Sequence, residues 1–121
     1  MTTDAAGTSG TNAGQIATIQ EGAQLVTLVN VFTVAPERQQ QVVDMLIDAT
    51  ERTMRNMPGF VSANIHRSFD GKKVINYAQW RSKDAFEAMQ KNPEAGVHMK
   101  TIAAMTSFEP TLCEVVSVNS A

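Results

Sequence analysis

The stretch Leu25 to Val34 constrains the fold more than any other part of the sequence. Its β-branched residues are typical of a strand, and side chains two apart share one face of a strand. One face carries Val26, Leu28, Asn30, Phe32 and Val34, and the other carries Leu25, Thr27, Val29, Val31 and Thr33. Because both faces are mainly apolar, both must be covered by other parts of the protein.

A second strand is predicted over residues 74–80. Val74, Asn76, Ala78 and Trp80 point to one side of it, and Ile75, Tyr77 and Gln79 point to the other. An amide and the chain's only tryptophan therefore share an otherwise apolar face. A buried amide needs a hydrogen-bond partner, so this face is the first candidate for a binding site.

Helical patterns connect these strands. After Pro36, a helix of about five turns is predicted by an apolar stripe at three-to-four spacing, made of Val42, Val43, Leu46, Ile47, Thr50 and Met54. Ser82 is a favourable N-cap for a second helix, whose buried side includes Ala85, Phe86 and Met89. A short third helix is predicted over residues 95–105.

Two further strands, over residues 60–69 and 111–118, complete the order β-α-β-β-α-β. This order is typical of the ferredoxin-like fold, an α+β architecture with one antiparallel sheet. We expect residues 23–121 to form a single domain. Residues 1–22, rich in Thr, Ala, Gly, Ser and Asn, are expected to form a flexible tail, in which Gln15 to Ile19 is a weak candidate for an extra strand.

Helices cover only one face of such a sheet. The other face, with Val29, Val31, Ile75 and Val115, would remain a large exposed apolar patch. A second copy of the same sheet would cover it, so we predict a homodimer in which two sheets pack face to face as an α+β barrel.

Composition excludes several classes of function. The formal net charge of −2 offers no basic surface for nucleic acid. There is no apolar run long enough to cross a membrane and no leader-like N-terminus, so a cytoplasmic location is expected. Cys113 has no second cysteine to pair with and reads as a small apolar filler. No metal-ligand cluster, phosphate loop or Ser-His-Asp arrangement is evident in the sequence.

Asn30 and Asn76 lie at the centres of strands that are neighbours in the ferredoxin-like order. Each amide buried without a partner would cost about 1–3 kcal/mol. Either the two side chains satisfy each other or hold a water, or they grip a mostly apolar ligand in a cavity between sheet and helices. Under the second reading, the ligand contacts are predicted to be Phe32, Asn64, Met54, Phe86 and Met89.

The position of His66 depends on the register of the hairpin around Asp70-Gly71. A two-residue loop would place Ile65 across from Asn76 and His66 on the opposite face. A type I turn over residues 68–71 with a glycine bulge would place Asn64 across from Asn76 and His66 on the cavity side, as a candidate general base. Ser, Asp and Gly occupy the positions preferred by the second turn, which we therefore favour.

Three segments resemble the antibiotic biosynthesis monooxygenase family. They are Leu28-Val29-Asn30-Val31-Phe32-Thr33-Val34, Pro58-Gly59-Phe60, and Asn76-Tyr77-Ala78-Gln79-Trp80 with Ser82 and Phe86. The set of Asn30, Asn76 and Trp80 is most similar to the cofactor-independent oxygenases that convert anthrone-type aromatic polyketides to quinones.

The resemblance implies a dimeric barrel with one pocket per subunit and O2 as co-substrate, without flavin or metal. It implies that Asn30 and Asn76 donate hydrogen bonds to substrate or peroxide oxygens, and that Trp80 either stacks on the rings or holds the oxygen-binding corner. Some relatives place a tyrosine acid on the second helix, near Phe86 in this chain, which leaves His66 or water as the candidates for protonation.

Two alternatives remain. In the heme-degrading monooxygenases of the same superfamily, Asn30 would match a pocket asparagine and His98 would lie near the axial histidine, although Met89 stands where their ring-distorting tryptophan is expected. The other alternative is a non-catalytic barrel that binds a small metabolite.

Overall fold

The structure, a computed structural model, describes residues 14–121. Its four-stranded antiparallel sheet has the order β2-β3-β1-β4. The elements along the chain are β1 (Val26–Thr33), the 3-10 helix η1 (Pro36–Arg38), α1 (Gln39–Arg52), the 3-10 helix η2 (Met54–Asn56), β2 (Phe60–Arg67), β3 (Lys73–Trp80), α2 (Lys83–Lys91), α3 (Pro93–Ala103) and β4 (Ser107–Cys113). This is the predicted ferredoxin-like order, with two helices in place of the second crossover helix.

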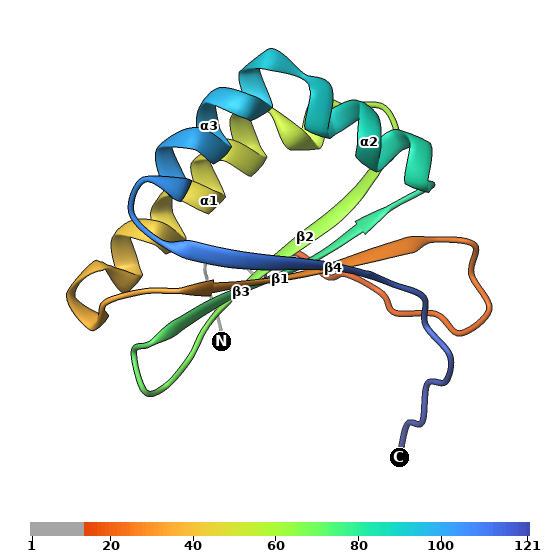
Figure 1. The fold of residues 1–121 in the computed structure, drawn as a ribbon. Coiled ribbons are helices and arrows are strands. Elements are labelled where there is room, and N and C mark those ends of the chain that lie inside the picture. Colours follow the sequence, from red (N-terminus) through yellow and green to blue (C-terminus); the bar gives the residue numbers. More distant parts are fainter. Residues whose placement is uncertain (1–13) are drawn as a thin grey trace.

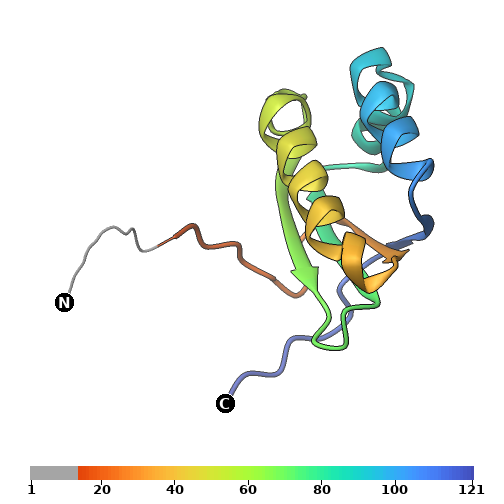
Figure 2. The ribbon, with the colours of Figure 1, turned by 90° about the vertical axis from the view of Figure 1, so that its left-hand side faces the viewer.

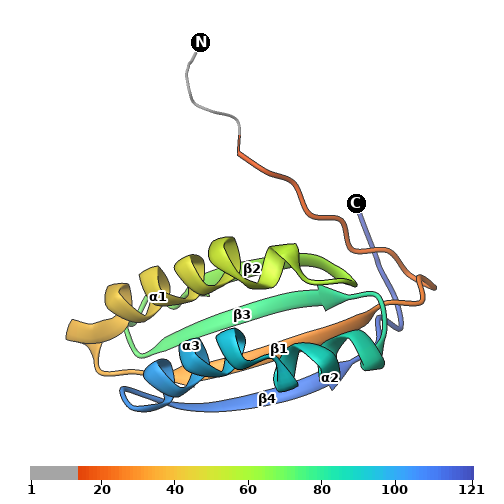
Figure 3. The same ribbon diagram turned by 90° about the horizontal axis from the view of Figure 1, so that it is seen from above.

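All three α-helices lie on one face of the sheet (Figure 1). Seen from above, α1 lies on the side of β2, and α2 and α3 lie in line over the side of β1 and β4 (Figure 3). Figure 2 shows α1 beside the row formed by α2 and α3, with residues 14–24 leading away from the sheet. Within residues 14–121 no helix covers the opposite face, which we call the outer face.

Capping side chains fix where α2 and α3 begin. Ser82 Oγ accepts a hydrogen bond from the backbone N–H of Ala85 at 3.0 Å, which is the predicted N-cap of α2. Asn92 Oδ1 accepts from the N–H groups of Glu94 and Ala95, and Pro93 occupies the first turn of α3. The break between the two helices therefore follows from Asn92 and Pro93.

The hydrophobic core fills the space between the sheet and the helices. Phe32 and Val74 are fully buried beneath Val42 of α1 and Ile102 of α3. A second cluster surrounds the buried Trp80 at the other end of the sheet. Core packing thus joins the helices to the sheet near both ends of the central strands.

The last strand lies earlier than predicted. It is Ser107–Cys113 rather than 111–118, because Phe108 packs against Phe32 of the neighbouring strand with ring centroids 5.5 Å apart. Val115 consequently lies outside the sheet, and Cys113 is exposed rather than an apolar filler. The alternating valines after Cys113 produced the wrong assignment.

Two other predictions are wrong in detail. Gln15 to Ile19 form no strand, although Thr18 O accepts a hydrogen bond from Gln79 Nε2 on the outer face. On α1, Ile47 is 39% exposed, while Ala49 is buried in the apolar stripe. The first part of the predicted tail, residues 1–13, lies outside the described residues.

The β2–β3 hairpin adopts the register that we did not favour. The i to i+3 bond from Gly71 N–H to Ser68 O and a φ of +82° at Gly71 agree with the expected turn, but Ile65 pairs with Asn76. Asp70 Oδ1 also accepts from the N–H of Lys72, and Ser68 Oγ accepts from the N–H of Lys73. These side-chain bonds draw one extra residue into the loop and shift β2 by one position.

Gly59 is required where β2 begins beneath α2. Its φ is +83°, and an added Cβ would lie 2.4 Å from Ala85 Cβ. We expect Gly59→Ala to lower the free energy of unfolding by about 2–4 kcal/mol, from backbone strain and overlap together. Urea denaturation measures this change.

Gly96→Ala is the matched control, because a Cβ at this α3 position meets no atom within 4 Å. This variant should be as stable as the parent protein, or more stable by about 0.5–1 kcal/mol from helix propensity. Equal effects of the two substitutions would contradict the steric argument at Gly59.

Candidate active site

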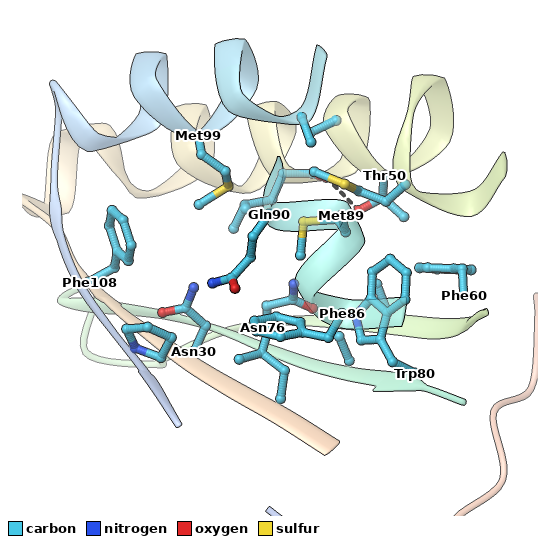
Figure 4. Close-up of a pocket in the computed structure, with 18 of the residues that line it drawn as sticks. Asn30, Thr50, Phe60, Asn76, Trp80, Phe86, Met89, Gln90, Met99 and Phe108 are labelled. Carbon is cyan, nitrogen blue, oxygen red and sulfur yellow. Dashed lines mark hydrogen bonds between the residues drawn. The ribbon is translucent and has the colours of Figure 1, made fainter. Parts of the chain in front are cut away.

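A cavity of about 260 Å³ lies between the sheet and the helices. Most of its lining is apolar, and a few amides point into it (Figure 4). The predicted site residues that line it are Asn30, Phe32, Met54, Asn76, Trp80, Phe86 and Met89. A mostly apolar cavity with a few convergent polar groups is typical of a small-molecule site.

Asn30 and Asn76 form the polar floor of the cavity. They are directly opposite each other in the β1–β3 ladder, so their side chains leave the same face of the sheet. The Oδ1 atoms of both are buried and accept no hydrogen bond from the described protein. The two asparagines therefore do not satisfy each other's carbonyl oxygens, and both oxygens are available to a ligand or to a water.

Trp80 forms one end of the cavity and is held by two other aromatic rings. Phe60 meets the indole edge-on, with centroids 5.5 Å apart and planes at 88°, and Phe86 meets it at 6.4 Å and 72°. Trp80 is only 2% exposed. These contacts fix the orientation of the indole before any ligand arrives.

Asn64 and His66 do not line the cavity. In the observed register Asn64 pairs with Tyr77 and His66 with Ile75, so both side chains lie on the outer face. Asn64 Nδ2 donates to Ser62 Oγ and to Tyr77 O, and the exposed His66 contacts the backbone carbonyl of Asn64 through Nδ1. The prediction of His66 as a base inside the cavity is therefore wrong.

Gln90, Thr50, Phe108 and Pro110 line the cavity but were not recognised in the sequence as site residues. Phe108 and Pro110 were missed because the last strand was placed too late in the chain. Thr50 was placed on the helix stripe, and its hydroxyl donates to Leu46 O at 2.8 Å. Gln90 follows Phe86 by one helical turn, and that spacing is a signal that could have found it.

The described lining of the cavity contains no side chain that ionises near neutral pH. The pKa of Asp70 is lowered, first by the hydrogen bond from Ser68 Oγ and then by the N–H of Lys72, but Asp70 lies in the exposed hairpin loop. The lining therefore offers a ligand amide dipoles and aromatic surface.

His98 does not face the cavity. Its Nε2 lies 3.1 Å from Thr53 Oγ1, which in turn donates to Glu94 Oε2 at 2.5 Å. The heme alternative thus lacks the axial histidine on which it depended. Among residues 14–121 no three His, Cys, Asp or Glu side chains are grouped to hold a metal ion, and none of the helices there is long and apolar enough to span a membrane.

Known proteins share both the sequence and the fold. The chain is 48% identical over 100 residues to tetracenomycin-F1 monooxygenase of Streptomyces glaucescens, covering 83% of this chain and 89% of that protein. SnoaB from Streptomyces nogalater, described as a cofactor-independent oxygenase, superposes with a TM-score of 0.65 at 28% identity, covering 79% of this chain and 97% of that chain. A monooxygenase from Streptomyces coelicolor, solved with nanaomycin D, shares the fold at 24% identity, with a TM-score of 0.64 over 81% of this chain and 94% of that chain.

Fold and cavity together define a ferredoxin-like α+β protein with a mainly apolar cavity between the sheet and the helices. A family model described as antibiotic biosynthesis monooxygenase matches residues 25–101. The chain belongs to this family and is a monooxygenase.

A substitution at Asn30 distinguishes a role in ligand binding from a role in stability. Asn30→Leu replaces a buried, unpartnered amide with an apolar group of similar size, so we expect the ligand-free protein to gain about 1–2 kcal/mol of stability. Oxygenase activity should fall in the same variant. Urea denaturation and a turnover assay measure the two effects.

Thr27→Val is the control, because Thr27 Oγ1 is also buried without a partner but lies on the outer face. This variant should gain stability and keep its activity. Destabilisation by Asn30→Leu would instead favour a purely structural role for the amide.

Proposed function

We propose that this protein is a cofactor-independent monooxygenase that oxidises an anthrone-like aromatic polyketide to a quinone with O2, through a carbanion of the substrate. The relatives support this reading, because one acts on tetracenomycin F1 and another is described as cofactor-independent.

One observation carries the proposal: the two unpartnered Oδ1 atoms of Asn30 and Asn76 on the floor of an apolar cavity. Such a floor suits a flat, mainly apolar molecule whose edge bears hydroxyl and carbonyl oxygens. Each asparagine amide accepts from a phenolic hydroxyl through Oδ1 and donates to an oxyanion through Nδ2. The same pair therefore binds the substrate and stabilises its ionised form.

The proposed reaction balances without a cofactor. Loss of a proton from the ring CH2 group gives a carbanion, which passes one electron to O2. The resulting radical and superoxide combine through a C–O bond to give a peroxide anion, which takes up a proton. Loss of the second ring proton then breaks the O–O bond, forming the quinone C=O and releasing hydroxide. The products are the quinone and one water.

No ionisable side chain of the described lining can accept the first proton. We infer that water at the cavity mouth takes it, while the amides lower the energy of the anion that remains. His66 cannot serve, since it lies on the outer face. The pH dependence of the rate should then follow ionisation of the substrate rather than of a histidine.

The test uses purified protein and dithranol in air-saturated buffer. Quinone absorbance should rise well above the spontaneous rate, and removal of O2 should abolish the rise. Asn76→Ala is expected to reduce kcat about 10- to 100-fold, because it removes a hydrogen bond to a charged intermediate. Trp80→Phe should reduce kcat/KM through loss of ring contact.

His66→Ala is the control for this assay, and its rate and pH profile should match those of the parent protein. Full activity of Asn76→Ala would show that the site is assigned to the wrong residues. Tight quinone binding without any turnover of anthrones would contradict the proposed substrate class.

We further propose that the protein is a homodimer built on the outer face of the sheet. Val31 and Ile75 are opposite each other there, as are Val29 and Tyr77, and all four are only partly buried in one copy. Pairing two such faces would cover apolar surface that the helices do not reach.

Ile75→Glu should convert the dimer to a monomer in sedimentation experiments, because it places charge at the centre of the paired faces. Gln41→Glu, on the exposed side of α1, should leave the assembly unchanged. A parent protein that sediments as a monomer at high concentration would contradict the proposed interface.

A further inference from the structure

We propose that Gln90 is a third substrate-binding amide, which selects ring systems that bear a hydroxyl at the end nearest the cavity mouth. This inference deepens the proposed function and rests on its substrate class, an aromatic polyketide. It concerns a residue on α2, on the wall opposite the two asparagines.

Helical spacing aims Gln90 at the cavity. It lies four residues after Phe86 and directly after Met89, and all three line the cavity. Phe86 is buried against Trp80, which fixes the rotation of α2 about its axis. In Figure 4 the Gln90 side chain descends from α2 with its amide toward Asn30.

The solvent exposure of Gln90 shows that its side chain lies at the mouth of the cavity. Gln90 is exposed, while Phe86, one turn earlier on the same face of α2, is only 6% exposed. Phe108 of β4, which also lines the cavity, is 36% exposed. The cavity therefore meets solvent near these two side chains.

The amide of Gln90 is uncommitted. Among residues 14–121 its side chain makes no hydrogen bond, unlike two other glutamines that are at least partly buried. Gln39 Nε2 donates to Ser68 O and Lys73 O, and Gln79 bonds Thr18 O and Ser62 Oγ. Gln39 and Gln79 join segments of the fold, whereas Gln90 presents both its donor and its acceptor to the cavity.

Three amides then surround one apolar space. The floor amides, Asn30 and Asn76, hold oxygens at the buried part of a flat ligand, and Gln90 reaches an oxygen nearer the mouth. A ligand with a hydroxyl at that position satisfies the third amide, and one without it leaves Gln90 to solvent. Because Gln90 is exposed, the preference should be modest.

The test compares chrysophanol and emodin, two anthraquinones that differ by one ring hydroxyl. Trp80 is the only tryptophan and lines the cavity, so quenching of its fluorescence reports binding without turnover. The parent protein should bind emodin more tightly. Gln90→Met keeps side-chain length without hydrogen bonds and should weaken emodin binding about 3- to 10-fold, while chrysophanol binding changes less than about twofold.

Gln41→Met, the same change on the exposed side of α1, is the control and should leave both dissociation constants unchanged. If Gln90→Met left the ratio of the emodin and chrysophanol dissociation constants unchanged, whether or not both became weaker, the assignment would be overturned. Because the readout is binding, failure of the protein to oxidise anthrones would be seen in the dithranol assay alone and would not be confused with failure of this inference.

Discussion

The cross-strand pair of Asn30 and Asn76 is the feature on which the site depends. Each buried carbonyl oxygen of this pair has no hydrogen-bond partner among the described residues, and such an unsatisfied group costs about 1–3 kcal/mol. A ligand that donates to both oxygens removes this cost. In the function that we propose, the same residues that weaken the empty protein provide its affinity for a hydroxylated ring system.

The two faces of the sheet treat polar side chains differently. On the face beneath the helices, packing around Phe32 and around Trp80 supports the two ends of the cavity without filling it. On the outer face, polar side chains such as Asn64 and Gln79 make hydrogen bonds within the protein. Of the buried polar side-chain atoms without a partner in the described residues, the Oδ1 atoms of Asn30 and Asn76 face the cavity, and Thr27 Oγ1 lies on the outer face.

Much of this arrangement could be predicted from the sequence, because strand alternation decides which side chains share a face. Asn30, Asn76 and Trp80 were placed correctly on that basis, and the strand order followed from the order of elements. The errors came from features that alternation does not encode. Side-chain bonds by Asp70 and Ser68 lengthened a hairpin loop and moved His66 to the outer face. Ring packing by Phe108 set the position of β4. Gln90 was missed although its spacing from Phe86 was visible.

The most direct test of this account is a crystal structure of the protein with a bound hydroxyanthraquinone. We predict that the Oδ1 atoms of Asn30 and Asn76 each lie about 2.7–3.2 Å from a ligand oxygen, with the rings against Trp80. A ligand bound elsewhere, or a ligand in the cavity with the two asparagines bonded only to each other, would contradict it.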